Sequence, residues 1–436
     1  MKERIKVVDS RPGSGKTTKA IQYINSLTDD IKVIYITPFL KECDRIKESC
    51  PNQNFYMPDS KLGKGSKMTN MINLIAKGRN VVSTHALFSN IDDRLIEAIR
   101  SHNYILILDE VMNVIEKFDL YKEDTRKTIE QKEGLTREDI KVLLQKNILK
   151  VDEETCAVSW IDEDSVLNKY IQLKTLADRE MLYLIQGDLL IWSFPIEVFR
   201  EGIFDEIFIL TYQFDYQIQA YYYKFFNLKY TTYFVKEIKK GIYEIFPLSE
   251  DLNHESEWRN SIRDLIHICD NDKMNKIGNT YYDATNHAIA TSLSKTWFDN
   301  AGRESIKVLV RNTTNFFQNF HKAKAPQKMW TCFKAHKKLF KSDFIPKKGW
   351  VELNARATND HSEKTVLAYT LNRYLNPFFV TFFSKKDIFL DQDKYALSEL
   401  IQWMFRSAIR NGKEIWVYIP SQRMRTLLTN WLNQED

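Results

Sequence analysis

The sequence lacks the features of a membrane protein, of a secreted protein and of a fold stapled by metal or disulfides. It contains no run of about 18 uncharged apolar residues, the length that a membrane-spanning helix needs, and Met1 to Arg4 do not open an apolar signal segment. Its five cysteines include no pair at the C-x2-C spacing typical of zinc sites, so we expect reduced thiols. With only 13 Gly and 10 Pro it is no collagen-like fibre. We therefore expect a soluble, cytoplasmic globular protein with no membrane partner.

The chain is long enough for more than one domain, and its charge is uneven. At roughly 100 to 200 residues per domain, 436 residues predict two or three domains with proper cores. The net charge is +5, but eleven Lys or Arg and a single acid, Asp343, lie between Lys307 and Lys348. That segment carries +10 and leaves −5 for the rest of the chain. We expect an anionic partner near it.

Short β-branched runs alternate with helical patterns, which is typical of an α/β fold around a parallel sheet. The expected strands of the first half are Arg4–Asp9, Lys32–Thr37, Asn80–Thr84, Tyr104–Asp109 and Ile207–Thr211. A second αβ region closes the chain. It comprises a helix near Ala396 to Ile409, a stop at Asn411 and Gly412, a strand Glu414–Ile419 and a helix after Ser421.

Two stretches between these regions are less regular. Residues 116–164 are charged and slightly acidic, with a capping-box start at Thr136 and Asp139 and then an expected hairpin. They indicate an insertion, either an accessory wedge or mere decoration. Residues 221–246 are aromatic and rich in β-formers. We predict a first lobe over 1–220 with an insertion of about 116–188, a β-rich joint over 221–246 and a second lobe over 247–436.

The first expected strand is followed by a glycine-rich loop, residues 9–18, with the sequence DSRPGSGKTT. A loop that wraps phosphates needs glycines so that backbone N–H groups turn inward, a lysine for the β and γ oxygens and a hydroxyl for Mg²⁺. Ser10 stands where the strict pattern has glycine, which matches the shorter form (A/S)-x-x-G-x-G-K-T. We predict that the nucleotide is bound by Gly13, Ser14, Gly15, Lys16, Thr17 and Thr18.

An acidic pair ends the apolar run over residues 104–110, YILILDE. We expect Asp109, with Thr17, to hold Mg²⁺, and Glu110 to orient and deprotonate the attacking water. A solvated Asp-Glu pair is the common alternative for such a dipeptide. Five apolar residues before the pair and a phosphate loop upstream favour the catalytic interpretation, and the added glutamate indicates hydrolysis.

These motifs together resemble the ATPase signature of superfamily 2 helicases and translocases, in the manner of the compact helicase-like ATPases that bacteriophages encode. Asp-Glu-Val-Met at 109–112 resembles the DExx box, and Ile209 to Tyr212 occupy the place of motif III. Thr37-Pro38-Phe39 resembles motif Ia, Ser83-Thr84-His85 motif Ib, and 354–359 motif V. The resemblance implies nucleic-acid contacts at Thr37, Pro38, Thr84, His85, Asn354, Arg356 and Thr358.

Three residues near the end of the chain, Gln402, Arg406 and Arg410, are spaced by four and would form one stripe of the expected helix. They resemble motif VI, with Phe405 in place of its glycine and the second arginine one residue late. The resemblance implies that an arginine from this helix acts on the γ-phosphate across a cleft. Arg406 is the first candidate and Arg410 the second, and a solvated basic face is the alternative.

The basic segment, residues 307–350, also contains eight Phe or Trp residues. Lysines that meet phosphates and flat rings on which bases stack are the ingredients of a single-strand track. The alternative is that the rings belong to the core and the lysines to a solvated face. The aromatic residues are Phe316, Phe317, Phe320, Trp330, Phe333, Phe340, Phe344 and Trp350.

The resemblance implies two RecA-like P-loop lobes that hydrolyse ATP with Mg²⁺ in the cleft between them, in order to move along or unwind DNA. RNA is not excluded as the track, replication or recombination proteins are candidate partners, and the compartment would be the host cytoplasm if a phage encodes the chain. Two alternatives stay open. One is a nucleotide-gated nucleic-acid-binding accessory protein with little turnover, and the other is a packaging-type ATPase motor.

Overall fold

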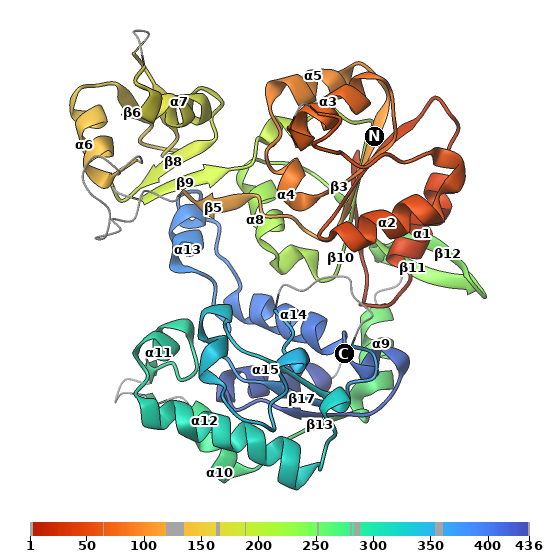
Figure 1. The fold of residues 1–436 in the computed structure, drawn as a ribbon, viewed down its shortest axis with the longest axis vertical. Coiled ribbons are helices and arrows are strands. Elements are labelled where there is room, and N and C mark those ends of the chain that lie inside the picture. Colours follow the sequence, from red (N-terminus) through yellow and green to blue (C-terminus); the bar gives the residue numbers. More distant parts are fainter. Residues whose placement is uncertain are drawn as a thin grey trace. The chain divides into compact units, whose positions relative to one another are not determined.

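The structure, a computed structural model, describes residues 3–63, 65–118, 135–162, 166–187, 189–250, 253–279, 281–282, 288–353 and 361–434. The chain forms two compact units (Figure 1). The first unit contains residues 1–8, 17–232 and 376–390, and the second contains residues 9–16, 233–375 and 391–436. Segments that are distant in the sequence therefore belong to one unit.

A seven-stranded sheet has the order β12-β11-β1-β10-β4-β2-β3. Its strands are β1 (Ile5–Asp9), β2 (Lys32–Thr37), β3 (Val81–Thr84), β4 (Tyr104–Asp109), β10 (Glu206–Thr211), β11 (Thr231–Lys239) and β12 (Ile242–Pro247). The pairs β10–β4, β4–β2 and β2–β3 are parallel, whereas β11 and β12 form an antiparallel hairpin. All of β4 is buried, as expected for a strand covered on both faces. The five predicted strands of the first half are confirmed to within one residue at each end.

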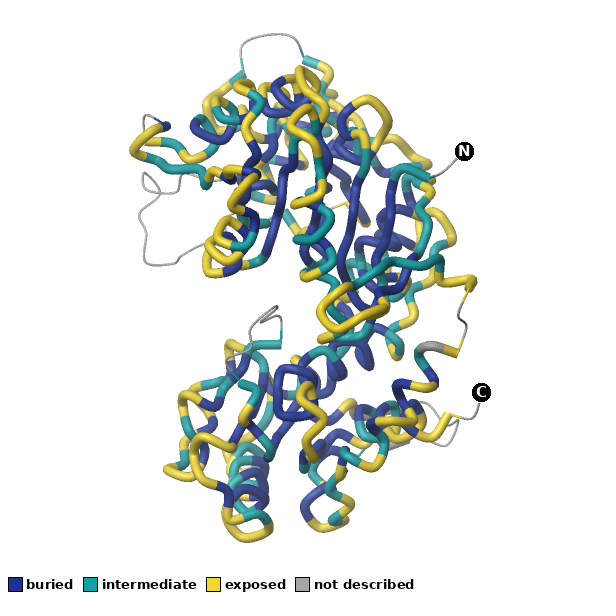
Figure 2. Tube along the Cα trace, turned by 90° about the vertical axis from the view of Figure 1, so that its right-hand side faces the viewer, coloured by how far each residue is buried: buried dark blue, intermediate teal, exposed yellow. Residues whose placement is uncertain are grey.

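Helices pack around this sheet and its hydrophobic core. They are α1 (Lys16–Asn25), α2 (Leu40–Ser49), α3 (Lys67–Ala76), α4 (His85–Phe88), α5 (Asp93–Arg100), α8 (Ile218–Phe225) and α13 (Pro377–Ser384). Helix α5 shows why they form: the Asp92 carboxylate caps its first turn, accepting from the Leu95 N–H, and Leu95, Ile96 and Ile99 are buried on one stripe. Figure 1 shows α3 and α5 side by side. Figure 2 shows that buried residues, in dark blue, form extended stretches in the interior of each unit, while exposed residues, in yellow, lie on its outside.

The predicted insertion forms a small αβ element with its own core. Its parts are β5 (Ile115–Lys117), α6 (Arg137–Gln145), β6 (Leu149–Val151), β7 (Val158–Trp160), α7 (Ile171–Asp178), β8 (Leu182–Ile185) and β9 (Leu189–Ser193). The predicted capping box is confirmed, because the Asp139 N–H donates to the Thr136 hydroxyl while the Asp139 carboxylate accepts from the Thr136 N–H. The predicted hairpin is confirmed as β6–β7. Strands β5, β9 and β8 form an antiparallel sheet.

The second unit is built on a four-stranded parallel sheet of order β13-β18-β17-β16. Its strands are β13 (Ile266–Ile268), β16 (Lys328–Thr331), β17 (Val366–Tyr369) and β18 (Ile415–Tyr418), and a two-stranded ribbon is made by β14 (Tyr281–Tyr282) and β15 (Ala288–Ala290). The helices are α9 (His254–Arg263), α10 (Asp272–Asn275), α11 (Lys295–Asn300), α12 (Arg303–Asn315), α14 (Gln392–Met404) and α15 (Gln422–Leu432). The predicted strand near 414–419 and the helix after Ser421, whose hydroxyl caps it, are confirmed.

One predicted element is wrong at its end. The helix expected to reach Ile409 ends at Met404, because the following residues bond to other segments: the Ala408 N–H donates to the Lys364 carbonyl at 2.9 Å. The stretch 221–246 contains β11 and β12, as its β-rich composition predicts, although its first five residues belong to α8. The predicted class holds: the fold is α/β, with two RecA-like lobes on parallel sheets and an insertion in the first. Among the described residues, no helix has both the length and the apolarity needed to cross a membrane.

Candidate active site

The phosphate loop follows β1 and leads directly into α1, whose first residue is Lys16. Gly13 and Gly15 have φ values of 83° and 96°, in the left-handed region that favours glycine. The Ser14 N–H donates to the Arg11 carbonyl at 3.2 Å and closes the turn. The Ser14 hydroxyl oxygen is buried without a hydrogen-bond partner among the described residues. The loop therefore has the strand, turn and helix order that phosphate binding requires.

The ammonium group of Lys16 folds back onto its own loop. It donates to the Ser10 carbonyl at 2.5 Å and to the Arg11 carbonyl at 3.1 Å. Because a bound phosphate would offer charged oxygens in place of these neutral carbonyls, it would be the better partner for the ammonium. Lys16 thus lies inside the loop that the sequence predicts to bind the nucleotide.

Contacts within the second unit explain why Ser10 replaces the usual glycine. Its hydroxyl oxygen accepts from the Val235 N–H on β11 at 2.7 Å, in a buried position. The next residue, Arg11, places its guanidinium 5.8 Å from the ring centroid of Trp258, a cation–π contact. Both contacts fix the start of the loop.

Asp109 ends β4 in a buried environment, with 4% of its surface exposed. Its Oδ2 accepts a hydrogen bond of 3.0 Å from the hydroxyl of Tyr35, a fully buried residue of β2. Burial and, to a lesser extent, the neighbouring Glu110 carboxylate raise the pKa of Asp109 to about 7. A nearby cation would favour the ionised form of this carboxyl group.

Glu110 has an unusual backbone conformation. Its φ is 72°, in a region that residues with a side chain rarely adopt, and its N–H is held by the Leu210 carbonyl at 2.9 Å. Its Oε2 is buried and makes no hydrogen bond within the part of the chain that the structure describes. Strained backbone clusters at functional sites, and here it fixes the direction of the carboxylate predicted to activate water.

Other polar side chains end the neighbouring strands. The hydroxyls of Thr37 (β2) and Thr211 (β10) are buried and lack hydrogen-bond partners among the described residues. Thr84, at the end of β3, caps α4 by accepting from the Leu87 N–H at 3.4 Å, and His85 is the first residue of that helix. Pro38 follows Thr37 and is partly exposed. Because carboxyl ends of parallel strands share one sheet edge, these residues lie along the edge that carries the acidic pair.

A small protein contribution suffices for Mg²⁺, which takes one or two carboxylates and completes its shell with phosphate and water. Asp109 offers a carboxylate and Thr17 a hydroxyl group, and the neighbouring Glu110 has an Oε2 that is buried without a hydrogen-bond partner among the described residues. Across the described ranges no group of three or more His, Cys, Asp or Glu could hold a metal by itself. The residues present therefore fit Mg²⁺ brought in with a nucleotide better than a resident metal.

The three residues expected on one helical stripe are separated in the structure. Gln402 lies in α14, whereas Arg406 and Arg410 follow the helix end. The Arg406 side chain is buried and donates to the Glu352 carbonyl at 3.1 Å and to the Leu353 carbonyl at 3.0 Å. The Arg410 side chain instead lies beside the phosphate loop, its Cγ and Nε 3.5 and 3.6 Å from the position of a Cβ on Gly13.

Two predicted groups of nucleic-acid residues have different outcomes. Asn354, Arg356 and Thr358 lie outside the described residues. In the basic segment the rings divide: Phe316, Phe317, Trp330 and Phe340 are buried, Phe333 and Trp350 are half-buried, and Phe320 and Phe344 are exposed. Several lysines of the segment, including Lys338 and Lys347, are exposed. Burial therefore assigns four of the rings to the core, and nucleic-acid contact stays a prediction for the exposed rings and lysines.

Sequence reasoning missed Tyr35 and Tyr243. Tyr35 had a usable signal, because side chains two apart on a strand share a face and Thr37 was already a candidate. Tyr243 had none, since its contact with the phosphate loop joins residues more than two hundred positions apart.

Comparison with known proteins assigns the chain to a family. It is 37% identical over 445 residues to the SPbeta prophage-derived uncharacterized protein YonV of Bacillus subtilis (strain 168), covering 99% of this chain and 100% of that protein. The chain belongs to the YonV family. Residues 260–432 match the YonV C-terminal Rossmann-like domain, and residues 129–192 match the YonV middle domain. The prophage origin of the relative agrees with the bacteriophage character suggested by the motifs, and the YonV middle domain overlaps the insertion.

Solved structures resemble this YonV-family chain only distantly. XPD in its apo form aligns with a TM-score of 0.49 at 10% identity, covering 98% of this chain and 95% of that one. The DUF1998 helicase MrfA bound to DNA and AMPPNP aligns with a TM-score of 0.35 at 9% identity, covering 99% of this chain and 48% of that one.

Proposed function

We propose that this YonV-family protein is an ATP-dependent nucleic-acid helicase or translocase. The observation that carries the proposal is Glu110, a non-glycine residue with a φ of 72° directly after a buried aspartate. One of its carboxylate oxygens is buried without a hydrogen-bond partner among the described residues, in a chain that also has a phosphate loop. Such a carboxylate has no evident structural task and is suited to accept a proton from water.

In the proposed reaction, a water oxygen attacks the γ-phosphorus of ATP. A bond forms between that oxygen and phosphorus, the bond from phosphorus to the β–γ bridging oxygen breaks, and Glu110 takes the proton of the water. The ammonium of Lys16 leaves the Ser10 and Arg11 carbonyls and binds the phosphates, together with the N–H groups of the loop. Mg²⁺, held by Thr17 and Asp109, would neutralise charge on the β and γ oxygens.

Gln402, Arg406 and Arg410, which the sequence predicts to be catalytic, are the proposed second group of site residues. We favour Arg410 as the arginine that stabilises the transferred phosphoryl group, because its side chain lies beside Gly13 of the loop. The guanidinium of Arg406 already serves two carbonyls, which suits a positioning role. An arginine of this kind contributes about 10³- to 10⁵-fold to the rate in related chemistry.

The nucleic-acid part of the proposal is supported by the basic segment, where exposed lysines accompany exposed Phe320 and Phe344. DNA is the proposed track, with RNA as an option. Thr37, Pro38, Thr84, His85, Asn354, Arg356 and Thr358 are the proposed contacts, of phosphate-positioning type. The protein is proposed to act in a host cytoplasm, with replication or recombination proteins as candidate partners.

The test is the ATPase rate of the full chain with and without single-stranded DNA, duplex DNA and RNA. We expect nucleic acid to raise the rate, and Lys16→Ala and Arg410→Ala to abolish it while Arg406→Ala mainly lowers stability. No turnover by the wild type under any condition would sink the proposal. ATP binding without turnover would instead indicate the nucleotide-gated accessory protein, and turnover insensitive to all nucleic acids would remove the helicase assignment.

A further inference from the structure

An aromatic side chain of the β11–β12 hairpin packs on the phosphate loop. Tyr243, in β12, is half-buried and pairs with Glu237 of β11. A Cβ built on Gly15 would collide with its ring: Cζ would be 2.8 Å away, and Cδ1 and Cε1 would be nearer still. The ring therefore lies in contact with the backbone of Gly15, the residue directly before Lys16. Glycine is required there twice over, by this contact and by the φ of 96°.

The two glycines of the loop have chemically different neighbours in the second unit. Gly13 faces the Arg410 side chain, a cation, whereas Gly15 faces the Tyr243 ring, a flat and largely apolar surface. A nucleoside triphosphate has the same polarity, since it is anionic at its phosphate end and aromatic at its base. A cation at one glycine of the loop and a ring at the next are complementary to such a ligand.

We propose that Tyr243 contacts the base of the bound nucleoside triphosphate by stacking, and so contributes nucleotide specificity to the site. The inference rests on the proposed function, because it assumes that the loop binds ATP. Base–aromatic stacking is worth about 1 to 3 kcal/mol per base in nucleic-acid complexes, which corresponds to about 5- to 100-fold in affinity. The ring can provide this without a hydrogen bond from its hydroxyl group.

The experiment compares two ligands that share phosphates but differ in having a base. Binding of ATP and of inorganic tripolyphosphate, each with Mg²⁺, is measured for the full-length wild type, Tyr243→Ala and Tyr243→Phe. We expect Tyr243→Ala to weaken ATP binding about 5- to 100-fold and to leave tripolyphosphate binding unchanged. Tyr243→Phe should bind both ligands as the wild type does. The matched control is Ile242→Ala, which removes an exposed side chain from the same strand.

Each other outcome has a separate meaning. If Tyr243→Ala weakens both ligands equally, the ring only supports the loop and the inference is overturned. If it strengthens both, the ring is a plug that phosphates must displace, which also overturns the inference. Unchanged ATP binding by Tyr243→Ala, with tight binding by the wild type, refutes the inference but leaves the proposed function intact. Absence of ATP binding by the wild type overturns both, and thermal melts of each variant show whether it is folded.

Discussion

The two main sheets of the molecule differ at the edge where the carboxyl ends of their parallel strands lie. At the carboxyl edge of the first sheet, the polar groups are buried and incompletely bonded: Asp109 has a raised pKa, Glu110 has a strained backbone, and Thr37 and Thr211 carry hydroxyls without partners among the described residues. Such groups lower stability unless another component satisfies them. This edge resembles a site prepared for a ligand.

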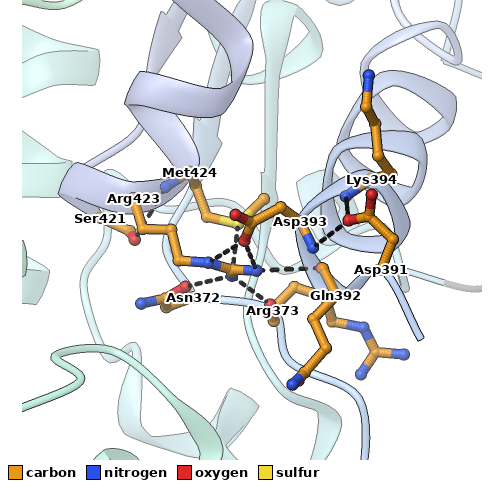
Figure 3. A network of polar contacts seen from close by, with 9 residues as sticks. All are labelled: Asn372, Arg373, Asp391, Gln392, Asp393, Lys394, Ser421, Arg423 and Met424. Atoms are coloured by element: carbon orange, nitrogen blue, oxygen red, sulfur yellow. Dashed lines mark hydrogen bonds and ion pairs between the residues drawn. The ribbon is translucent and has the colours of Figure 1, made fainter. Parts of the chain in front are cut away.

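At the carboxyl edge of the second sheet, one guanidinium organises the segments that follow the strands (Figure 3). Arg423, in the first turn of α15, donates to the side-chain oxygen of Asn372 at 3.1 Å, to the Arg373 carbonyl at 2.7 Å, to the Gln392 carbonyl at 3.0 Å and to Asp393. Asp393 and Asp391 sit at the start of α14, where carboxylates complement the helix dipole. This difference supports our proposal that the first edge binds a ligand for chemistry, whereas the bonded network of the second edge stabilises the fold.

The largest expected effect concerns Glu110. Replacing it by glutamine keeps its shape but removes its ability to accept a proton, so the ATPase rate should fall about 10²- to 10⁴-fold. ATP affinity and the melting temperature should change little. The matched control is Glu116→Gln, an exposed glutamate shortly after it in the chain. Equal rates for the wild type and Glu110→Gln would contradict the chemical interpretation of the first edge.

Asp109 offers a test through stability and pH. Its folded pKa, about 7, lies above the ordinary value of 3.8, so the folded state binds the proton more tightly. The folding free energy gained from this tighter proton binding is fully present below pH 3.8. It is lost as the pH rises through the folded pKa of about 7. Asp109→Asn, which is uncharged at every pH, should therefore stabilise the nucleotide-free protein increasingly between pH 4 and 8, by at most about 4 kcal/mol.

Urea denaturation at several pH values measures this difference. Asp29→Asn, a change at an exposed aspartate, controls for the loss of one negative charge. A stability difference that stays constant from pH 4 to 8 would show that the pKa of Asp109 is not raised in the folded protein. The polar groups of the first edge would then be as well satisfied as those of the second.

The sequence predicted those elements whose conformation depends on neighbouring residues. The phosphate loop, β4 and the Thr136 capping box depend on neighbouring residues, and the structure has each of these elements at the predicted position. The stripe of Gln402, Arg406 and Arg410 failed because the partners of Arg406 are carbonyls more than fifty residues earlier, and periodicity carries no information about them. Burial of Phe317 against exposure of Phe320 likewise depends on packing with distant segments.

The second edge is tested by Arg423. We expect Arg423→Ala to lower the free energy of unfolding by about 2 to 4 kcal/mol, because partly buried carbonyls lose a charged donor. Arg423→Lys should restore less than half of that, since an ammonium cannot reproduce the planar fork. The ion pair itself contributes little, because the Asp393 side chain is 63% exposed. Arg311→Ala on α12, an exposed position, is the control. If Arg423→Lys is as stable as the wild type, the planar shape of the guanidinium is not what stabilises this edge.

The smallest expected effect concerns the basic segment, the part of the second unit that we propose to contact nucleic acid. Phe320 is 51% exposed and ends a π-helical turn over Phe316–Phe320, a feature frequent at functional sites. Phe320→Ala should weaken single-stranded DNA binding by about 1 kcal/mol without changing its salt dependence, because no charge is lost.

Lys347→Ala should instead reduce the slope of log affinity against log salt by about 0.7. Phe389→Ala, which removes an 82% exposed ring from the first unit, is the matched control. If the Phe320→Ala and Phe389→Ala variants bind DNA equally, the exposed ring of Phe320 makes no specific contact with DNA. Only the lysines of the segment then remain as candidates for nucleic-acid contact.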